Sequence, residues 1–239
     1  MLLHTRFLCL LFLAILTLPS WAQVQAISTD RPDQSDGVYT LPKRSFQLES
    51  GITIAKNTAL SNTMLRYGLL QGTEFRVAID AGTTTGIKGL LPLNLSIKQK
   101  INAAQGLLPA TALLADVTLG PLASRNFSQN KLDYGLKLSF EHEISDALSF
   151  CYNVGGSNSL NILNLSGSLA FASSAKTSWF AEYFAELNTL QKEHNIDIGW
   201  TTALARGLQM DFAIGHAIFD HDKRLFTTIG LSYCFDDKP

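Results

Sequence analysis

Long apolar segments, cysteines and charges are all scarce in this sequence. Charged residues make up 16% of the 239 residues, and the 19 lysines and arginines almost balance the 20 aspartates and glutamates. A net charge of −1 provides no basic surface of the kind that binds nucleic acid, so we expect no nucleic-acid partner. Beyond residue 22, no apolar run reaches the roughly 18 residues that a membrane-spanning helix needs, which excludes a helical span.

The first 22 residues, MLLHTRFLCLLFLAILTLPSWA, have the pattern of a secretory signal peptide. Arg6 lies in a short positive start, an apolar run follows, and Ser20 and Ala22 are small residues at the positions that a signal peptidase reads. The alternative is a membrane anchor, but the apolar run is too short to span well. We therefore expect cleavage after Ala22.

Two of the three cysteines, Cys151 and Cys234, follow the predicted signal peptide. In an oxidising compartment they could form a disulfide. Two separate small residues on distant strands fit the sequence as well, so both alternatives stay open.

Apolar and polar residues alternate along most of the mature chain. In LDYGLKLSFEHEI (132–144), Leu136 and Phe140 fall on one face, whereas Lys137 and Glu141 fall on the other. A period of two indicates a β-strand, and most of these segments have close to the roughly 9–11 residues that cross a bilayer at a tilt. The twelve segments with this pattern are 45–55, 62–70, 73–81, 91–101, 107–119, 132–144, 148–156, 161–171, 178–187, 194–205, 208–219 and 225–235.

The polar face of these segments favours a membrane barrel over a soluble β-sandwich or a lipocalin-like barrel. Glycines recur on that face, where they would relieve crowding inside a closed barrel, and tyrosines and tryptophans recur on the apolar face. We therefore predict an all-β fold: a single closed antiparallel transmembrane β-barrel of about 12 strands at 45–235, in contact with outer-membrane lipid in the bacterial outer membrane. Tight turns alternate with longer connections, so we expect both chain ends in the periplasm and the connections at 57–62, 81–89 and 120–130 outside.

Charges on the inward face divide into two groups, one on the early strands and one on the late strands. The two groups face each other across a barrel of 12 strands. They either produce a transverse field that orients dipolar solutes in a channel, or neutralise each other and close the lumen. Inward acids outnumber inward bases, which predicts weak cation selectivity for an open lumen. The basic wall comprises Arg66, Arg76, Lys98 and Lys100, and the acidic wall comprises Glu182, Glu186, Asp197 and Asp211.

Arg66 and Arg76 lie nearly opposite each other when their two strands pair across a tight turn. Like charges in that position destabilise a sheet. Glu49 and Glu74 are close enough to neutralise them, so we interpret these four residues as a structural charge network in preference to a substrate site.

Several stretches carry a resemblance to a known family: TDRPDQSDG (29–37), SFQLESGI (45–52), LRYGLLQGTEFRV (65–77), SWFAEYFAE (178–186) and GLSYCF (230–235). The chain resembles the transporter-like outer-membrane proteins named after the meta-pathway of phenol degradation. The resemblance implies a single β-barrel with a transport role for an unknown small solute. Its most specific piece is the motif Thr29, Asp30, Arg31 and Pro32.

The two ends of the mature chain lack strand alternation. Residues 23–44 are either a disordered periplasmic segment or a segment tucked into the periplasmic mouth, with Arg31 paired to an inward acid such as Glu141 or Glu143. At the other end, a tail at 236–239 follows Phe235. An aromatic C-terminal residue resembles the signal read by the barrel-insertion machinery, so insertion here would rely on an internal version of that signal.

Other functional classes find little support in the sequence, and we expect no enzyme, no cofactor and no metal. An outer-membrane lipid hydrolase is a remote alternative, because His142 and His216 face outward but Ser139 faces inward and Ile144 occupies the next outward position after His142. The acidic cluster in DHDKR (220–224) has the composition of a solvated loop. A structural or surface-interaction barrel without transport is the third alternative.

Overall fold

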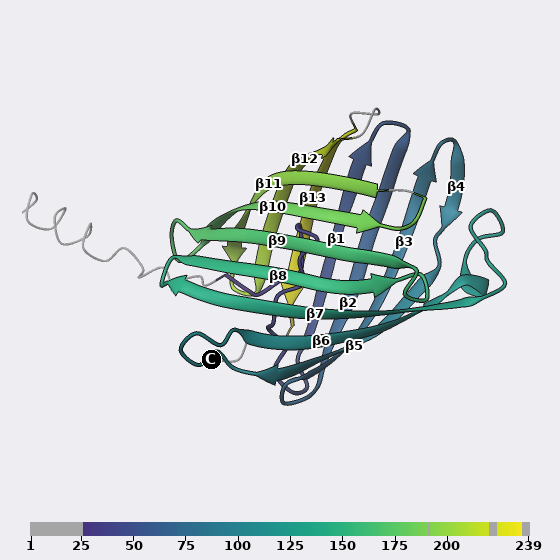
Figure 1. Ribbon diagram of the computed structural model, residues 1–239. Helices are drawn as coiled ribbons and strands as arrows, with labels where there is room; N and C mark the ends of the chain where they lie inside the picture. Colours follow the sequence, from purple (N-terminus) through teal and green to yellow (C-terminus); the bar gives the residue numbers. More distant parts are fainter. Residues whose placement is uncertain (1–25, 191, 220–223, 236–239) are drawn as a thin grey trace, which may run out of the picture.

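The computed structural model describes residues 26–190, 192–219 and 224–235, which form one barrel of β-strands (Figure 1). The predicted signal peptide, most of the DHDKR loop and the tail at 236–239 lie outside the described residues. The strands are β1 (Phe46–Ala55), β2 (Thr58–Leu70), β3 (Thr73–Thr84), β4 (Ile87–Leu90), β5 (Leu93–Asn102), β6 (Ala110–Leu119), β7 (Leu132–Ser145), β8 (Leu148–Ser157), β9 (Ile162–Ala172), β10 (Thr177–Leu187), β11 (Lys192–Ala205), β12 (Leu208–Ile218) and β13 (Leu225–Cys234), with a 3-10 turn, η1, at Gly120–Leu122.

Antiparallel pairing of neighbouring strands closes the barrel. Strand β1 pairs with both β2 and β13, and β2 also pairs with β3, so the ring has no free edge. The short β4 pairs only with β3 and forms a hairpin beyond the ring, which leaves 12 strands in the ring itself. The predicted closed antiparallel barrel of about 12 strands is therefore confirmed. Among the described residues, no helix is long and apolar enough to cross a membrane.

Apolar side chains point outward from this barrel and charged side chains point inward. On β10, Trp179 is 52% exposed on the outer face, whereas Glu182 is buried in the lumen. On β2, Leu65 is exposed while the neighbouring Arg66 is fully buried. This distribution is the inverse of a water-soluble protein and matches a surface that contacts lipid.

The two ends of the barrel differ in their connections. We call the end with the turns at 71–72, 146–147, 173–176 and 206–207 the turn end, and the opposite end the loop end. The turn end is the one that the sequence places in the periplasm. Cys151 and Cys234 both face the lumen by register, and no disulfide joins them.

Two of the predicted loops at the loop end are wrong. Strand β2 begins at Thr58 and β3 continues to Thr84, so tight turns replace the loops expected at 57–62 and 81–89. The outward-apolar pattern is inverted near this end of β2, where Leu60 and Met64 line a lumen cavity. Backbone pairing with β1 and β3 sustains the strand there regardless of the side-chain pattern.

Glycines on the inward face allow the residues that precede β1 to approach the barrel wall closely. A Cβ at Gly68 would lie 1.8 Å from the Pro42 carbonyl oxygen, and a Cβ at Gly51 would lie 2.1 Å from a guanidinium nitrogen of Arg31. A Cβ at Gly230 would lie 2.6 Å from the same side chain. The inward glycines therefore make room for residues that precede β1.

We expect Gly68→Ala to destabilise the protein by about 1–3 kcal/mol, because the added methyl would overlap a backbone carbonyl that cannot rotate away. Gly167→Ala is the matched control, since Gly167 is also mid-strand but a Cβ there meets only Phe150 ring atoms at ordinary distances. Heat-dependent mobility of the folded barrel on gels measures both. Equal midpoints for the two variants would contradict close docking at Gly68.

Candidate functional site

Residues 26–44 run inside the barrel without forming helix or strand (Figure 1). At the start of this segment, Ala26 N donates to Ala175 O at 3.4 Å, and at its end Arg44 N donates to Gly68 O at 2.7 Å. Both contacts lie at the turn end, so the segment enters the lumen and returns through the same mouth. We call residues 26–44 the lumen plug.

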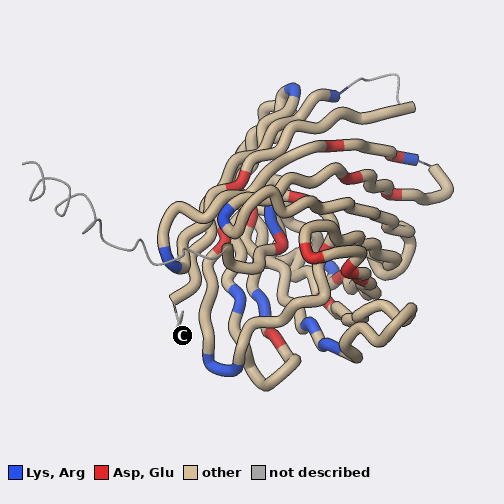
Figure 2. Tube along the Cα trace, turned by 90° about the vertical axis from the view of Figure 1, so that its left-hand side faces the viewer, with Lys and Arg blue, Asp and Glu red and all other residues tan. Residues whose placement is uncertain are grey.

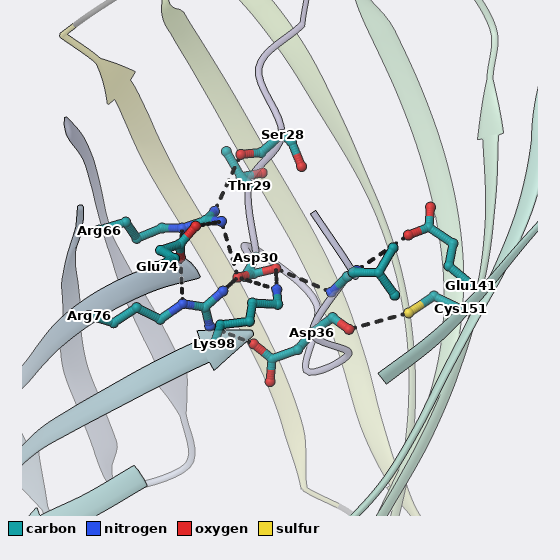
Figure 3. Close-up of polar contacts among 12 residues, drawn as sticks. Ser28, Thr29, Asp30, Asp36, Arg66, Glu74, Arg76, Lys98, Glu141 and Cys151 are labelled. Atoms are coloured by element: carbon teal, nitrogen blue, oxygen red, sulfur yellow. Dashed lines mark hydrogen bonds and ion pairs between the residues drawn. The ribbon is translucent and has the colours of Figure 1, made fainter. Parts of the chain in front are cut away.

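The plug's Asp30 lies among three cations of the wall (Figure 3). Its carboxylate is bound by Arg76 and accepts hydrogen bonds from Lys98 Nζ at 3.3 Å. Arg66 Nη2 lies 3.6 Å from the same carboxylate. The Asp30 side chain is only 7% exposed, so these contacts are largely shielded from water.

A second plug carboxylate, Asp36, binds the same wall. Arg76 Nη1 donates to it at 2.9 Å and Lys137 Nζ donates at 2.6 Å. Arg76 thus holds Asp30 with one terminal nitrogen and Asp36 with the other. We call Arg66, Arg76, Lys98 and Lys137 the basic cluster.

The basic cluster keeps both plug carboxylates ionised. Burial raises the pKa of Asp30, but attraction to Arg76 and Lys98 outweighs burial and lowers that pKa from 3.8 to about 2. Burial likewise opposes ionisation of Asp36, and Lys137 holds the pKa of that carboxyl well below its usual range. Both groups therefore carry full negative charge at neutral pH.

The structure brings together the four residues of the predicted charge network. Arg66 donates to Glu49 and to Glu74, each at 2.7 Å, and Arg76 Nε donates to Glu74 at 2.6 Å. The two glutamates also accept from the plug backbone: Asp30 N lies 3.2 Å from Glu49 and Leu41 N lies 2.8 Å from Glu74. The network is therefore part of the surface that receives the plug.

On the opposite side, the plug presents hydrogen-bond donors to the acidic wall. Glu182 accepts from Gln34 N at 2.7 Å and from the Ser35 hydroxyl. Arg31 Nη2 donates to Asp211 at 3.2 Å and to the Thr228 hydroxyl at 2.9 Å. The plug therefore presents acids to the basic wall and donors to the acidic wall.

Arg31 pairs with an inward acid, as expected, but that acid is neither Glu141 nor Glu143. Its partner is Asp211, and Glu141 instead accepts from Val38 N at 3.4 Å. The physical reason is the cross-strand glycine pair Gly51 and Gly230, which leaves room for the guanidinium against β1 and β13.

The other motif residues anchor the same stretch of chain. Thr29 accepts from Gln209 at 3.0 Å and donates to the Arg31 carbonyl at 2.9 Å, while Pro32 is buried. Two predicted wall residues lie apart from the plug contacts, because Lys100 is exposed at the turn end of β5 and Glu186 is exposed toward the loop end of β10.

Asp33 is a plug carboxyl that lies near other carboxylates, so its surroundings oppose its ionisation. Burial raises its pKa well above the usual range, and the carboxylates of Glu182, Asp30 and Asp197 raise it further. Asp197 is itself buried on the wall. Docking of the plug therefore gains from Asp30 and Asp36 and loses from Asp33.

Charge in the basic cluster balances only with the plug in place. The four cations meet two wall carboxylates, Glu49 and Glu74, and two plug carboxylates, Asp30 and Asp36. Figure 2 shows the lysines and arginines in blue and the aspartates and glutamates in red along a trace that is otherwise uncharged. This balance is not visible in the sequence, because Lys137 and Asp36 are 101 positions apart and no local pattern links them.

Two cavities remain in the lumen on the loop side of the plug, with volumes of about 300 and 360 Å³. Gln34, at the tip of the plug, lines both. Phe184 lines one and Phe226 the other, and their rings meet edge to face at 6.0 Å. Most of the other lining residues are polar, among them Asn94 and Asn153 in the smaller cavity, but polar and apolar surface contribute about equally.

A family model described as "Putative MetA-pathway of phenol degradation" matches residues 29–235. The chain belongs to this family. The match begins at Thr29, so it includes the plug motif as well as the barrel. No curated protein sequence matches the chain.

Solved structures with a similar fold are outer-membrane channels. The COG4313 outer membrane channel from Pseudomonas putida F1 aligns with a TM-score of 0.66 and 10% identity, over 87% of this chain and 100% of that one. The KdgM porin, solved with disordered oligogalacturonate, aligns with a TM-score of 0.63 and 7% identity, over 78% of this chain and 98% of the porin. The NanC porin aligns with a TM-score of 0.56 and 10% identity, over 78% and 98%. The chain thus has the β-barrel fold of these outer-membrane porins and channels.

The residues weighed for other functions lie away from the plug. By register His142 and His216 face outward, and His142 stacks against Tyr152 with ring centroids 6.0 Å apart, while Ser139 is buried on the inward face. Within the described ranges, no group of three or more metal-ligating side chains could hold a metal ion.

Asp30 lies among cations and Asp33 lies among carboxylates, so replacing each with asparagine should change the stability of plug docking in opposite directions. Asp30→Asn leaves buried cations without a partner and should accelerate amide exchange across residues 29–41 by about 100-fold, since losing one partner of a buried pair costs about 3 kcal/mol. Asp33→Asn removes a carboxyl that faces acids and should slow the same exchange by about tenfold. Hydrogen–deuterium exchange of the folded barrel measures both. Acceleration by both variants would contradict the charge pairing described here.

Proposed function

We propose that this protein is an outer-membrane channel for small polar solutes and that the lumen plug closes it at rest. The observation that carries the proposal is the way the plug is held. Residues 26–44 add no strand to the sheet and are bound by ion pairs and hydrogen bonds to both walls. Water or a polar solute can replace such contacts one by one, whereas a paired strand must be peeled away from the sheet.

The contents of the lumen also support a transport role over a purely structural one. A barrel of this size has too wide a lumen for wall side chains alone to fill as they do in eight-stranded barrels. Apolar packing of a permanent filling would be at least as stable as buried ion pairs, because each buried charge costs several kcal/mol to desolvate. A plug that is held by ion pairs is therefore better suited to reversible release than to permanent closure of the lumen.

The cavities on the loop side define the kind of solute that the channel admits. Amide side chains such as Asn94 and Asn153 offer both donors and acceptors, and the Phe184 and Phe226 rings add a small apolar surface. Each cavity of about 300–360 Å³ holds a molecule of a few to a dozen heavy atoms. A small polar solute fits such a chamber.

Deleting residues 23–40 after the signal peptide should convert small or rare conductance steps into large and steady ones in planar bilayers, because the obstruction is gone. Full-length Asp30→Asn with Asp36→Asn provides a second route to the open state that leaves the wall intact. Heat-dependent gel mobility confirms that each variant is folded.

The outcomes separate the alternatives. Folded deletion protein without conductance would contradict the channel and leave a structural barrel. Equal conductance of the intact and deleted proteins would show that the plug does not close the pore. The predicted weak cation selectivity is measured in the same bilayers and stays a prediction.

A further inference from the structure

The basic cluster binds the plug carboxylates as a receptor binds a ligand. Asp30 and Asp36 reach it from a segment that is separate from the sheet, and each receives at least two charge-assisted contacts. Charge-assisted bonds of this kind are among the strongest that a protein forms with a carboxylate. The plug therefore shows which chemical groups this part of the wall can hold.

Wall residues orient the cluster independently of the plug. Glu74 accepts from Arg66 Nε and from Arg76 Nε, which leaves the Nη1 and Nη2 nitrogens of Arg76 directed at the two plug aspartates. Glu49 holds Arg66 Nη1 at 2.7 Å from the next strand. A guanidinium fixed in this way offers two separate positions for carboxylates.

Withdrawal of the plug would remove two of the four carboxylates that form ion pairs with the basic cluster. Among the described residues, the ion pairs that remain on the four cations are those of Arg66 and Arg76 with Glu49 and Glu74. Arg66 and Lys98 are fully buried with the plug docked, so the charges would lie in a confined, low-dielectric lumen. Such a site attracts anions, and two charges of the same sign suit a solute with two negative groups.

A solute can reach the cluster while the plug is still docked. The Lys137 side chain is 26% exposed and lines the cavity of about 300 Å³ on the loop side, together with Gln34 at the plug tip. Lys137 is the member of the basic cluster that lines this cavity, and it is bound there by Asp36. Displacement can therefore begin at Asp36 and proceed through Arg76 to Asp30.

We propose that the basic cluster is a binding site for dicarboxylate solutes, and that Asp30 and Asp36 occupy it as an internal substitute until such a solute displaces the plug. The inference rests on the proposed channel function for its physiological meaning, but the binding itself does not require conductance. Solute and plug compete for the same cations, so each must weaken the other's binding.

The test uses plug release as its readout and succinate as its probe. Val38 is 7% exposed in the docked plug, so a cysteine there is shielded until the plug leaves. In full-length folded protein with Val38→Cys, Cys151→Ser and Cys234→Ser, succinate should raise the rate of thiol labelling by about fivefold or more over sodium chloride of equal ionic strength. Matching the ionic strength removes simple screening of the ion pairs.

Three further variants locate the effect. Lys137→Gln should abolish most of the response to succinate. Lys100→Gln, on the same strand as Lys98 but exposed at the turn end, is the matched control and should respond like the parent. Asp36→Asn, which removes one internal carboxylate without changing the wall, should lower the succinate concentration that gives half of the effect.

The results distinguish this proposal from the channel function. An equal response to succinate, acetate and chloride, or a response that survives in Lys137→Gln, would overturn the dicarboxylate site even if the deletion protein conducts. Succinate-dependent labelling in a protein that never conducts would support the site and contradict the channel. A response to succinate that Asp36→Asn leaves at the same half-effective concentration would overturn the role of Asp36 as a competitor.

Discussion

The Asp30 carboxylate, held among Arg76, Lys98 and Arg66 inside the barrel, is the interaction on which the docked plug depends. Three cations on the lumen wall would repel one another strongly in a confined space of low dielectric. Glu49 and Glu74 offset part of that repulsion from the wall, and Asp30 and Asp36 complete the neutralisation from the plug. The wall and the plug are thus electrostatically incomplete without each other.

This arrangement explains why the lumen contains so much buried charge. Arg66, Glu74 and Lys98 are fully buried, which a stable core avoids unless each charge has a partner. When both members of an ion pair are present, their attraction largely offsets the free energy needed to remove them from water. When one member is absent, this free energy is not offset. In the proposed gating, buried ion pairs would therefore separate a docked plug from a released one, with few stable positions between them.

The barrel was predictable from the sequence because strand periodicity is local. Trp179 and Glu182 fall on opposite faces of β10 for a reason visible in ten residues, and the same pattern repeats along the chain. At Leu60 and Met64 apolar side chains point inward, against the alternation. The start of β2 is therefore not predictable from the pattern, because backbone pairing with β1 extends the strand there.

The plug was only partly predictable. Opposite charges in Arg66, Arg76, Glu49 and Glu74 indicated a network, because neighbouring strands place them in register. The partners of Asp30, Arg31 and Asp36 depend on how an irregular segment folds back across the lumen, and no periodicity encodes that path. Glycines on the inward face were a usable signal, since Gly51, Gly68 and Gly230 mark where the plug approaches the wall.

A disulfide between the plug and the far wall tests the docked plug most directly. The hydroxyl oxygens of Ser35 and Ser166 lie 2.8 Å apart, so Ser35→Cys with Ser166→Cys should place two thiols within bonding reach. In protein lacking Cys151 and Cys234, we expect this pair to oxidise nearly completely in folded barrels. Ser35→Cys with Ala78→Cys, whose second position faces the lumen from β3 on the other side, should stay reduced. Equal oxidation of the two pairs, or none in the first, would contradict a plug docked between the charged walls.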